Sequence, residues 1–110
     1  MNALLAQHCS HRVAALGHDA ALALLAQVPG WAIVGGKLCR DYALRDYHEA
    51  IAFVNALAAM IHAEDHHPEM TVTYKQVSLR YDTHSVQGLS ENDFICAAKA
   101  DAIYAARSGA

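Results

Sequence analysis

The sequence contains few charged residues and no cluster of basic ones. Charged side chains make up 17% of the chain, the formal net charge is −3, and the eight lysines and arginines are scattered. A surface that grips a phosphate backbone needs basic residues gathered in one place, so direct binding of nucleic acid is disfavoured. The hydrophobic content of 55% is ample for a core.

Linkers, a signal peptide and a membrane span are not evident either. No stretch is rich in proline, glycine or serine and no repeat occurs, so we expect residues 1–110 to form one domain. The start of the chain, MNALLAQHCSHR, lacks the charged region and apolar run of a signal peptide. The most apolar stretch, residues 51–61, is 11 residues long and contains Asn55, whereas a membrane span needs roughly 20.

Cysteines are few and far apart. Cys9, Cys39 and Cys96 are odd in number and widely spaced, which does not fit a disulfide framework and favours reduced thiols. Together with the two preceding absences, this predicts a soluble cytoplasmic protein that does not enter a membrane.

A short helix and a hairpin are predicted in the first half of the chain. Asp19 precedes the helix-forming stretch AALALLAQ, which it could cap and which Pro29 and Gly30 end. The stretches WAIV and LCRDYAL, joined by GGK, are typical of a strand pair. Apolar residues recur at even spacing in the second stretch, and two glycines permit the positive φ of a tight turn.

A long helix follows this hairpin. Asp46 and Glu49 have the spacing of a capping box. Pro68 bars the helix from continuing and biases His67 toward extended geometry, so residues 63–70, AEDHHPEM, are predicted to leave the helix. Apolar residues recur inside it at spacings of three and four, as a helix lying on a sheet requires: Tyr47, Ile51, Phe53, Val54, Leu57, Ala58, Met60 and Ile61.

A second hairpin and a last helix complete the pattern. Val72 and Tyr74 share one face of TVTY, and residues 77–82 alternate strictly between apolar and polar, with His84 at or just past the end. Ser90 opens a strongly helix-forming segment. The predicted fold class is α+β, in the order α-ββ-α-ββ-α. It has two layers, with a four-stranded antiparallel sheet of two hairpins and helices packed on one face.

Three imidazoles and three carboxylates crowd into residues 62–69, and three interpretations compete. His62 and His66 have the HxxxH spacing of a zinc pair, but Ala63 stands where a metalloprotease needs glutamate, and Cys9-Ser10-His11 is too weak a pattern to add ligands. Alternatively, these are solvated residues at a helix end, where the macrodipole favours histidine. Thirdly, imidazoles can exchange protons near neutral pH, which suits acid–base catalysis.

The stretch DHHPEMTVTYKQVSLRYDTHSVQGLSENDF resembles the pattern of the pterin-4a-carbinolamine dehydratase family. The resemblance extends to PGW at residues 29–31 and RDYHEAIAFVNALA at residues 45–58. This chain has Met70 where the family commonly has tryptophan, and His62 where many members have an acidic residue. The landmarks that carry the resemblance are His66-His67-Pro68, Tyr74, Thr83-His84, Gly88-Leu89-Ser90 and Asp93.

The resemblance implies a hydro-lyase, a 4a-hydroxytetrahydrobiopterin dehydratase without metal or organic cofactor. Such an enzyme removes the 4a-hydroxyl and the N5 proton of the carbinolamine as water, and so recycles the pterin cofactor of aromatic amino acid hydroxylases such as phenylalanine hydroxylase. His66 and His84 are then the acid and base, in an order that the resemblance does not give. The residues implied in substrate binding are His67, Pro68, Met70 and Asp93. Asp93 has a second interpretation, because Ser90 and Asp93 also form a capping-box variant.

The resemblance also implies partners. The family's usual assembly is a homotetramer, a dimer of dimers, and the exposed edges of a four-stranded sheet make self-association plausible. A non-catalytic role is the alternative, since animal members also act as dimerisation cofactors of a homeodomain transcription activator. The three histidines favour the enzyme, because a scaffold has no need of them. Biopterin, monapterin and a molybdopterin precursor all remain candidate substrates.

Overall fold

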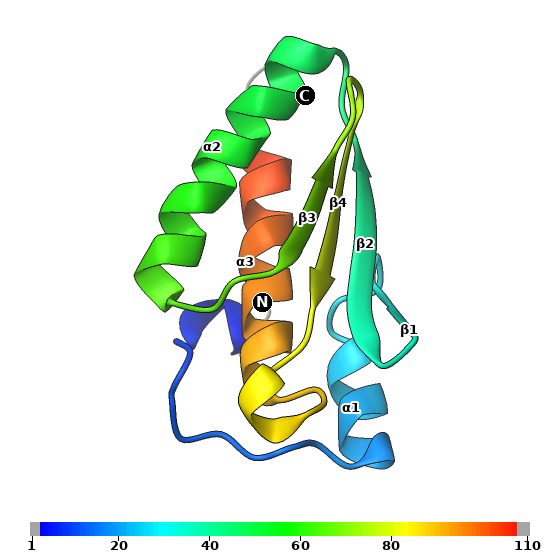
Figure 1. Ribbon diagram of the computed structural model, residues 1–110, viewed down its shortest axis with the longest axis vertical. Helices are drawn as coiled ribbons and strands as arrows, with labels where there is room; N and C mark the ends of the chain where they lie inside the picture. The colour runs from blue at the N-terminus through cyan, green and yellow to red at the C-terminus, as the bar shows by residue number, and fades with distance from the viewer. Residues whose placement is uncertain (1–2, 108–110) are drawn as a thin grey trace.

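The computed structural model describes residues 3–107, which form an α-helical layer on an antiparallel sheet (Figure 1). This confirms the predicted fold class and element order. The helices are α1 (His18–Leu25), α2 (Tyr47–Glu64) and α3 (Glu91–Ala106), and the strands are β1 (Ala32–Val34), β2 (Lys37–Ala43), β3 (Glu69–Val72) and β4 (Gln76–Tyr81). Two short 3-10 helices, η1 (Ala3–Ala6) and η2 (His84–Val86), complete the set.

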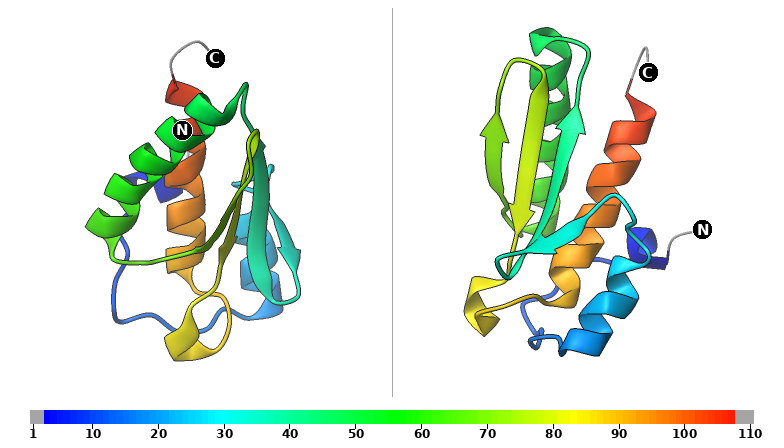
Figure 2. Two further views of the ribbon diagram at one scale, coloured as in Figure 1. Left: turned by 45° about the horizontal axis from the view of Figure 1, so that its top comes forward. Right: turned by 90° about the vertical axis from the view of Figure 1, so that its right-hand side faces the viewer.

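The sheet has the strand order β1-β2-β4-β3, so the two hairpins meet through β2 and β4. Their antiparallel register places Tyr42 opposite Val77 and Leu38 opposite Tyr81. Helices α2 and α3 cover one face of the sheet, and α1 packs beside α3 (Figure 2). The first hairpin turns through Gly35 and Gly36, whose φ angles of 58° and 79° are as predicted.

The core lies between this sheet face and the two long helices. Its largest members are fully buried and belong to β2, β4, α2 and α3, so each layer hides its apolar side against the other. Burying one such side chain contributes about 1.5–3 kcal/mol. These side chains include Leu38, Tyr42, Leu57, Leu79, Tyr81 and Phe94. Within residues 3–107, no helix is both long enough and apolar enough to span a bilayer.

Both early helices start differently from the prediction. Gly17, in extended geometry and without a side-chain bond, is the N-cap of α1, so Asp19 lies in the first turn instead. In α2, Asp46 accepts the Glu49 N–H at 2.8 Å as predicted. The Glu49 carboxylate, however, accepts the N–H of Arg45 at 2.7 Å, one residue earlier than a capping box requires.

The buried stripes also differ in detail. In α2 the buried apolar residues are Ala50, Phe53, Leu57 and Ile61, whereas Tyr47 is 57% exposed. Ala58 is exposed as well. Tyr74 is 68% exposed and lies in a turn, because β3 ends at Val72, opposite Val77. The prediction that Tyr47 and Ala58 belong to the core-facing stripe of α2 was therefore wrong, and Tyr74 lies outside the strand in which the sequence placed it.

Candidate active site

The helix α2 ends at Glu64 because Asp65 adopts the left-handed conformation, with φ 51° and ψ 43°. The chain therefore leaves the helix within residues 63–70, as the sequence predicted, with Ala63 and Glu64 still in its last turn. Since His66 lies beyond the last turn, it does not share a helical face with His62. Residues 3–107 contain no group of three or more histidine, cysteine, aspartate and glutamate side chains arranged to hold a metal ion.

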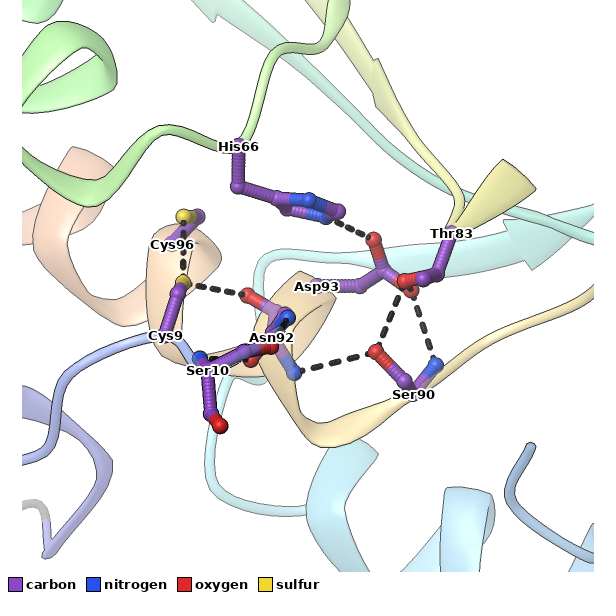
Figure 3. Close-up of polar contacts among 8 residues, drawn as sticks. All are labelled: Cys9, Ser10, His66, Thr83, Ser90, Asn92, Asp93 and Cys96. Atoms are coloured by element: carbon purple, nitrogen blue, oxygen red, sulfur yellow. Dashed lines mark hydrogen bonds and ion pairs between the residues drawn. The ribbon is translucent and has the colours of Figure 1, made fainter. Parts of the chain in front are cut away.

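His66 is fixed from two sides, of which Figure 3 shows the contact with Asp93. Its Nε2 lies 2.6 Å from Oδ1 of Asp93, and its ring stacks on Tyr81 with 5.4 Å between centroids and 13° between planes. The His66 side chain is 13% exposed and that of Asp93 is fully buried. The imidazole thus has one nitrogen on a buried carboxylate and one face on an aromatic ring.

The second oxygen of Asp93 is also occupied. Oδ2 accepts the Thr83 hydroxyl and the Ser90 N–H, each at 2.9 Å, and the Ser90 hydroxyl lies 2.7 Å from that of Thr83. Ser90 and Asp93 form a complete capping box at the start of α3. The two geometries foreseen for Asp93, helix capping and contact with a histidine, therefore coexist on its two oxygens.

This network determines which nitrogen of His66 carries a proton. Two donors reach Oδ2 of Asp93, which favours the ionised form of this buried carboxylate, and an ionised carboxylate can only accept. Nε2–H of His66 is therefore the donor to Asp93, and Nδ1 is the nitrogen left to exchange a proton with a ligand.

The other predicted histidines are more open. His84 is the first residue of η2 and directly follows Thr83, so the chain brings it to the edge of the same network. His67 directly follows His66. The side chains of both are exposed and have no hydrogen-bond or ion-pair partner within residues 3–107. Pro68 is half-buried before β3, and Met70, opposite Leu79 in β3, packs against the core.

A cavity of about 190 Å³ opens beside His66. A larger cavity of about 530 Å³, between the start of α2 and the end of α3, contains none of the predicted site residues. We place the candidate site at the smaller cavity because His66 and the residues on both sides of His84 line it. The full lining is Cys9, Ser10, His11, Val13, Glu64, Asp65, His66, Thr83, Ser85 and Asn92.

The N-terminal part of this lining was missed by sequence reasoning. Cys9 and Ser10 reach partners that lie 55 and 82 positions away, and no periodic pattern marks such contacts. The one signal was the run of polar residues His8-Cys9-Ser10-His11 in an otherwise apolar start. Cys9 also places its Sγ 3.4 Å from that of the buried Cys96.

Tyr81 and Cys96 are buried next to this network. Burial raises the pKa of the Tyr81 phenol well above its ordinary range, and the neighbouring Cys96 adds to the effect. The Cys9 contact and burial likewise raise the pKa of the Cys96 thiol. Among the residues that the structure describes, the buried Tyr81 hydroxyl has no hydrogen-bond partner of good geometry. Both groups are thus neutral.

Comparison with known proteins decides the family. Residues 14–103 match the family model described as "Pterin 4 alpha carbinolamine dehydratase". The chain belongs to this family. The resemblance seen in the sequence is thereby confirmed, and membership of the pterin-4-alpha-carbinolamine dehydratase family supports dehydratase activity on a pterin carbinolamine.

Relatives and a solved structure agree with this family. A protein of Dechloromonas aromatica is 50% identical over 91 residues, 83% of this chain and 81% of its own length. One of Xanthomonas oryzae pv. oryzae is 50% identical over 102 residues, with coverage of 88% and 86%. Both carry the provisional name pterin-4-alpha-carbinolamine dehydratase. The crystal structure of a "transcriptional coactivator/pterin dehydratase" from Brucella melitensis matches with a TM-score of 0.78 and 30% identity, over 82% of this chain and 98% of that one.

Proposed function

We propose that this protein converts a 4a-hydroxytetrahydropterin to the quinonoid dihydropterin and water by histidine acid–base catalysis. It would act in the cytoplasm as a homotetramer, and so recycle the pterin cofactor of an aromatic amino acid hydroxylase. Membership of the dehydratase family supports the reaction. The observation that supports the catalytic assignment is the contact of 2.6 Å between His66 and the buried Asp93.

The reaction needs two proton transfers and no redox change. The N5 lone pair forms the new double bond to C4a as the bond from C4a to the hydroxyl breaks. Hydroxide is a poor leaving group, so an acid must protonate it, and a base must accept the proton of N5. Steps of this kind typically contribute about 10²- to 10⁴-fold to a rate.

We assign the base to His66 and the acid to His84. The negative charge of Asp93 stabilises the imidazolium that forms when Nδ1 of His66 accepts a proton, which favours His66 as the acceptor. His84 is exposed and can regain its proton from solvent after each turnover. His67, between His66 and Pro68, is assigned to holding the pterin ring together with Met70.

The direct test is a decay assay. A phenylalanine hydroxylase generates the carbinolamine, and its absorbance is followed with and without this protein after exhaustive chelation of metals. Acceleration well above the spontaneous rate supports the proposal. A decay equal to the spontaneous rate contradicts it.

A non-catalytic binding role is the second candidate. The observation that favours it is the description of the Brucella melitensis protein as a transcriptional coactivator as well as a pterin dehydratase. A chain that assembles with a partner protein but leaves the carbinolamine decay unchanged would support this role over the enzyme.

A further inference from the structure

Residues 8–13 run along the cavity beside His66, although they precede the residues that match the family model. This segment, the blue part of the chain, passes the end of α2 and then η2 before it reaches α1 (Figures 1 and 2). Cys9, Ser10, His11 and Val13 supply one side of the cavity lining. We call residues 8–13 the N-terminal wall.

Glu64 anchors the start of the wall. Its carboxylate accepts the Cys9 N–H at 2.7 Å, lies 2.8 Å from Nδ1 of His8, and is 3.8 Å from the Lys99 ammonium. The side chain of Glu64 is only 6% exposed. Burial raises its pKa, but the bonds from Cys9 and His8 and the charge of Lys99 outweigh burial and hold the pKa below its ordinary value.

Asn92 anchors the middle of the wall. Its Oδ1 accepts the Ser10 N–H at 3.0 Å, and its Nδ2 donates to the Ser10 carbonyl at 2.8 Å. Asn92 is 6% exposed, so both bonds are shielded from water. One carboxamide thereby satisfies both backbone groups of Ser10, as a neighbouring strand would, and fixes the position of this residue.

The two anchors flank the pair that defines the site. Glu64 ends α2, two positions before His66, and Asn92 lies next to Asp93 in the first turn of α3. The end of α2 and the start of α3 therefore hold both the wall and the pair of His66 and Asp93. Figure 3 shows Ser10 on Asn92 next to His66 on Asp93. Movement of the wall away from the cavity would break these bonds and the contact of Cys9 Sγ with Cys96 Sγ, but it would not break the bond between His66 and Asp93.

We propose that the N-terminal wall is part of the pterin-binding site and that Asn92 and Glu64 are positioning residues that hold it against the cavity. This rests on the proposed dehydratase function. A fixed wall lets the pterin bind without first ordering a loop. Loss of an anchor lowers affinity for the pterin and leaves the proton chemistry of His66 intact.

The test compares Asn92→Ala with Glu91→Ala. Both truncate a side chain in the first turn of α3, but Glu91 is exposed and the two bonds to Ser10 come from Asn92. Neither change touches the bonds of Asp93. Equilibrium binding of 7,8-dihydrobiopterin, a stable reduced pterin, is measured by calorimetry, and hydrogen exchange reports on the Ser10 amide. We expect Asn92→Ala to speed this exchange and weaken binding about tenfold. Glu91→Ala should match the unaltered protein.

Steady-state kinetics give a second test of the role of the wall. In Asn92→Ala, KM for the carbinolamine should rise about tenfold while kcat and its pH profile stay within about twofold. Glu64→Ala should behave in the same way. Glu64→Gln, which keeps an acceptor for the Cys9 N–H, should retain most of the affinity.

A disulfide that restores the position of the wall distinguishes the loss of an anchor from a general loss of folding. Diamide removes one hydrogen from each thiol of Cys9 and Cys96, is itself reduced to the hydrazine, and leaves a disulfide that tethers the wall to α3. With 3.4 Å between the two sulfurs, oxidation of Asn92→Ala should restore pterin affinity. The double variant Asn92→Ala, Cys96→Ser should show no rescue.

The outcomes separate this inference from the proposed function. If pterin binding depends on Asn92 but the protein does not accelerate carbinolamine decay, the role of the wall is supported and the dehydratase function is contradicted. If Asn92→Ala and the unaltered protein accelerate the decay equally, with the same KM and pterin affinity, the dehydratase function is supported and the role of the wall is contradicted. Failure of the unaltered protein to bind the pterin overturns it too.

Discussion

Nε2 of His66 lies 2.6 Å from Oδ1 of Asp93, and the other oxygen of Asp93 caps the helix on which it stands. The orientation of the imidazole is therefore tied to the start of α3. The carboxylate of Asp93 both leaves Nδ1 of His66 free to exchange a proton and stabilises the helix. Substitutions near it can therefore change catalysis and stability together, and experiments must separate the two effects.

Asp93→Asn and Ser90→Ala should separate these two effects. Asp93→Asn removes the charge that stabilises a protonated His66, and we expect kcat to fall roughly 10- to 100-fold. Ser90→Ala removes a helix cap, worth about 1 kcal/mol, but leaves the Asp93 charge in place. It should lower the free energy of unfolding while kcat changes little. Carbinolamine decay and urea denaturation measure the two quantities, and equal kcat values for the two variants would refute the role of the charge.

The histidines should differ in kinetics. His66→Ala and His84→Ala should lower kcat with a modest change in KM, because each removes a proton transfer made in the transition state. His67→Ala should raise KM more than it lowers kcat. His62→Ala is the control, since His62 lies within α2 and is exposed to solvent. Small and equal effects at all four positions would contradict the acid–base assignment. Circular dichroism melts check that each variant folds.

The protein should form a homotetramer. Strand β3 is an edge of the sheet, and its residues Thr71 and Val72 are exposed, so its unpaired backbone groups can join a second copy. Light scattering at micromolar concentration should give about four times the chain mass of 11.9 kDa. A mass near 11.9 kDa would contradict this prediction.

Asp101 should contribute to stability without contributing to catalysis. Its Oδ1 accepts from Trp31, Arg40 and Tyr42 at 3.0, 2.7 and 2.6 Å, and so ties α3 to the sheet. Asp101→Ala leaves three donors without their acceptor, so unfolding should become easier by about 1–3 kcal/mol. The exposed Asp41 on β2 is the control, because Asp41→Ala should cost far less. Urea denaturation compares them, and kcat should stay unchanged in both.

Acidification should weaken the folded state partly through Glu64. Because the folded-state pKa of Glu64 is held below its ordinary value of 4.5, the folded protein binds fewer protons than the unfolded chain in this range. The stabilisation is present above pH 4.5 and is lost as the pH falls below it. Glu64→Gln should therefore show a shallower loss of stability than the unaltered protein between about pH 5 and 3. Parallel curves in thermal melts across this range would contradict the assignment.

Local patterns explain how much of the fold could be predicted. The glycine turn at Gly35 and Gly36, the start of α3 at Ser90, and the end of α2 before Pro68 depend on the backbone preferences of a few consecutive residues. Such preferences act in any context, and the sequence displays them directly. Tyr47 and Tyr74 show the limit, because both fit an apolar spacing, yet neighbouring elements do not extend far enough to cover them.

The sequence by itself determined the element order and the presence of His66, His67, His84 and Asp93 in a recognisable pattern, since both follow from short-range spacing. Only the tertiary structure decided that β2 pairs with β4, that Asp93 receives His66 on one oxygen, and that Ser10 lies against Asn92. Each of these contacts joins segments that are distant in the chain. Their partners are selected by how the layers pack and by which buried polar groups need satisfaction, and that information belongs to the assembled fold.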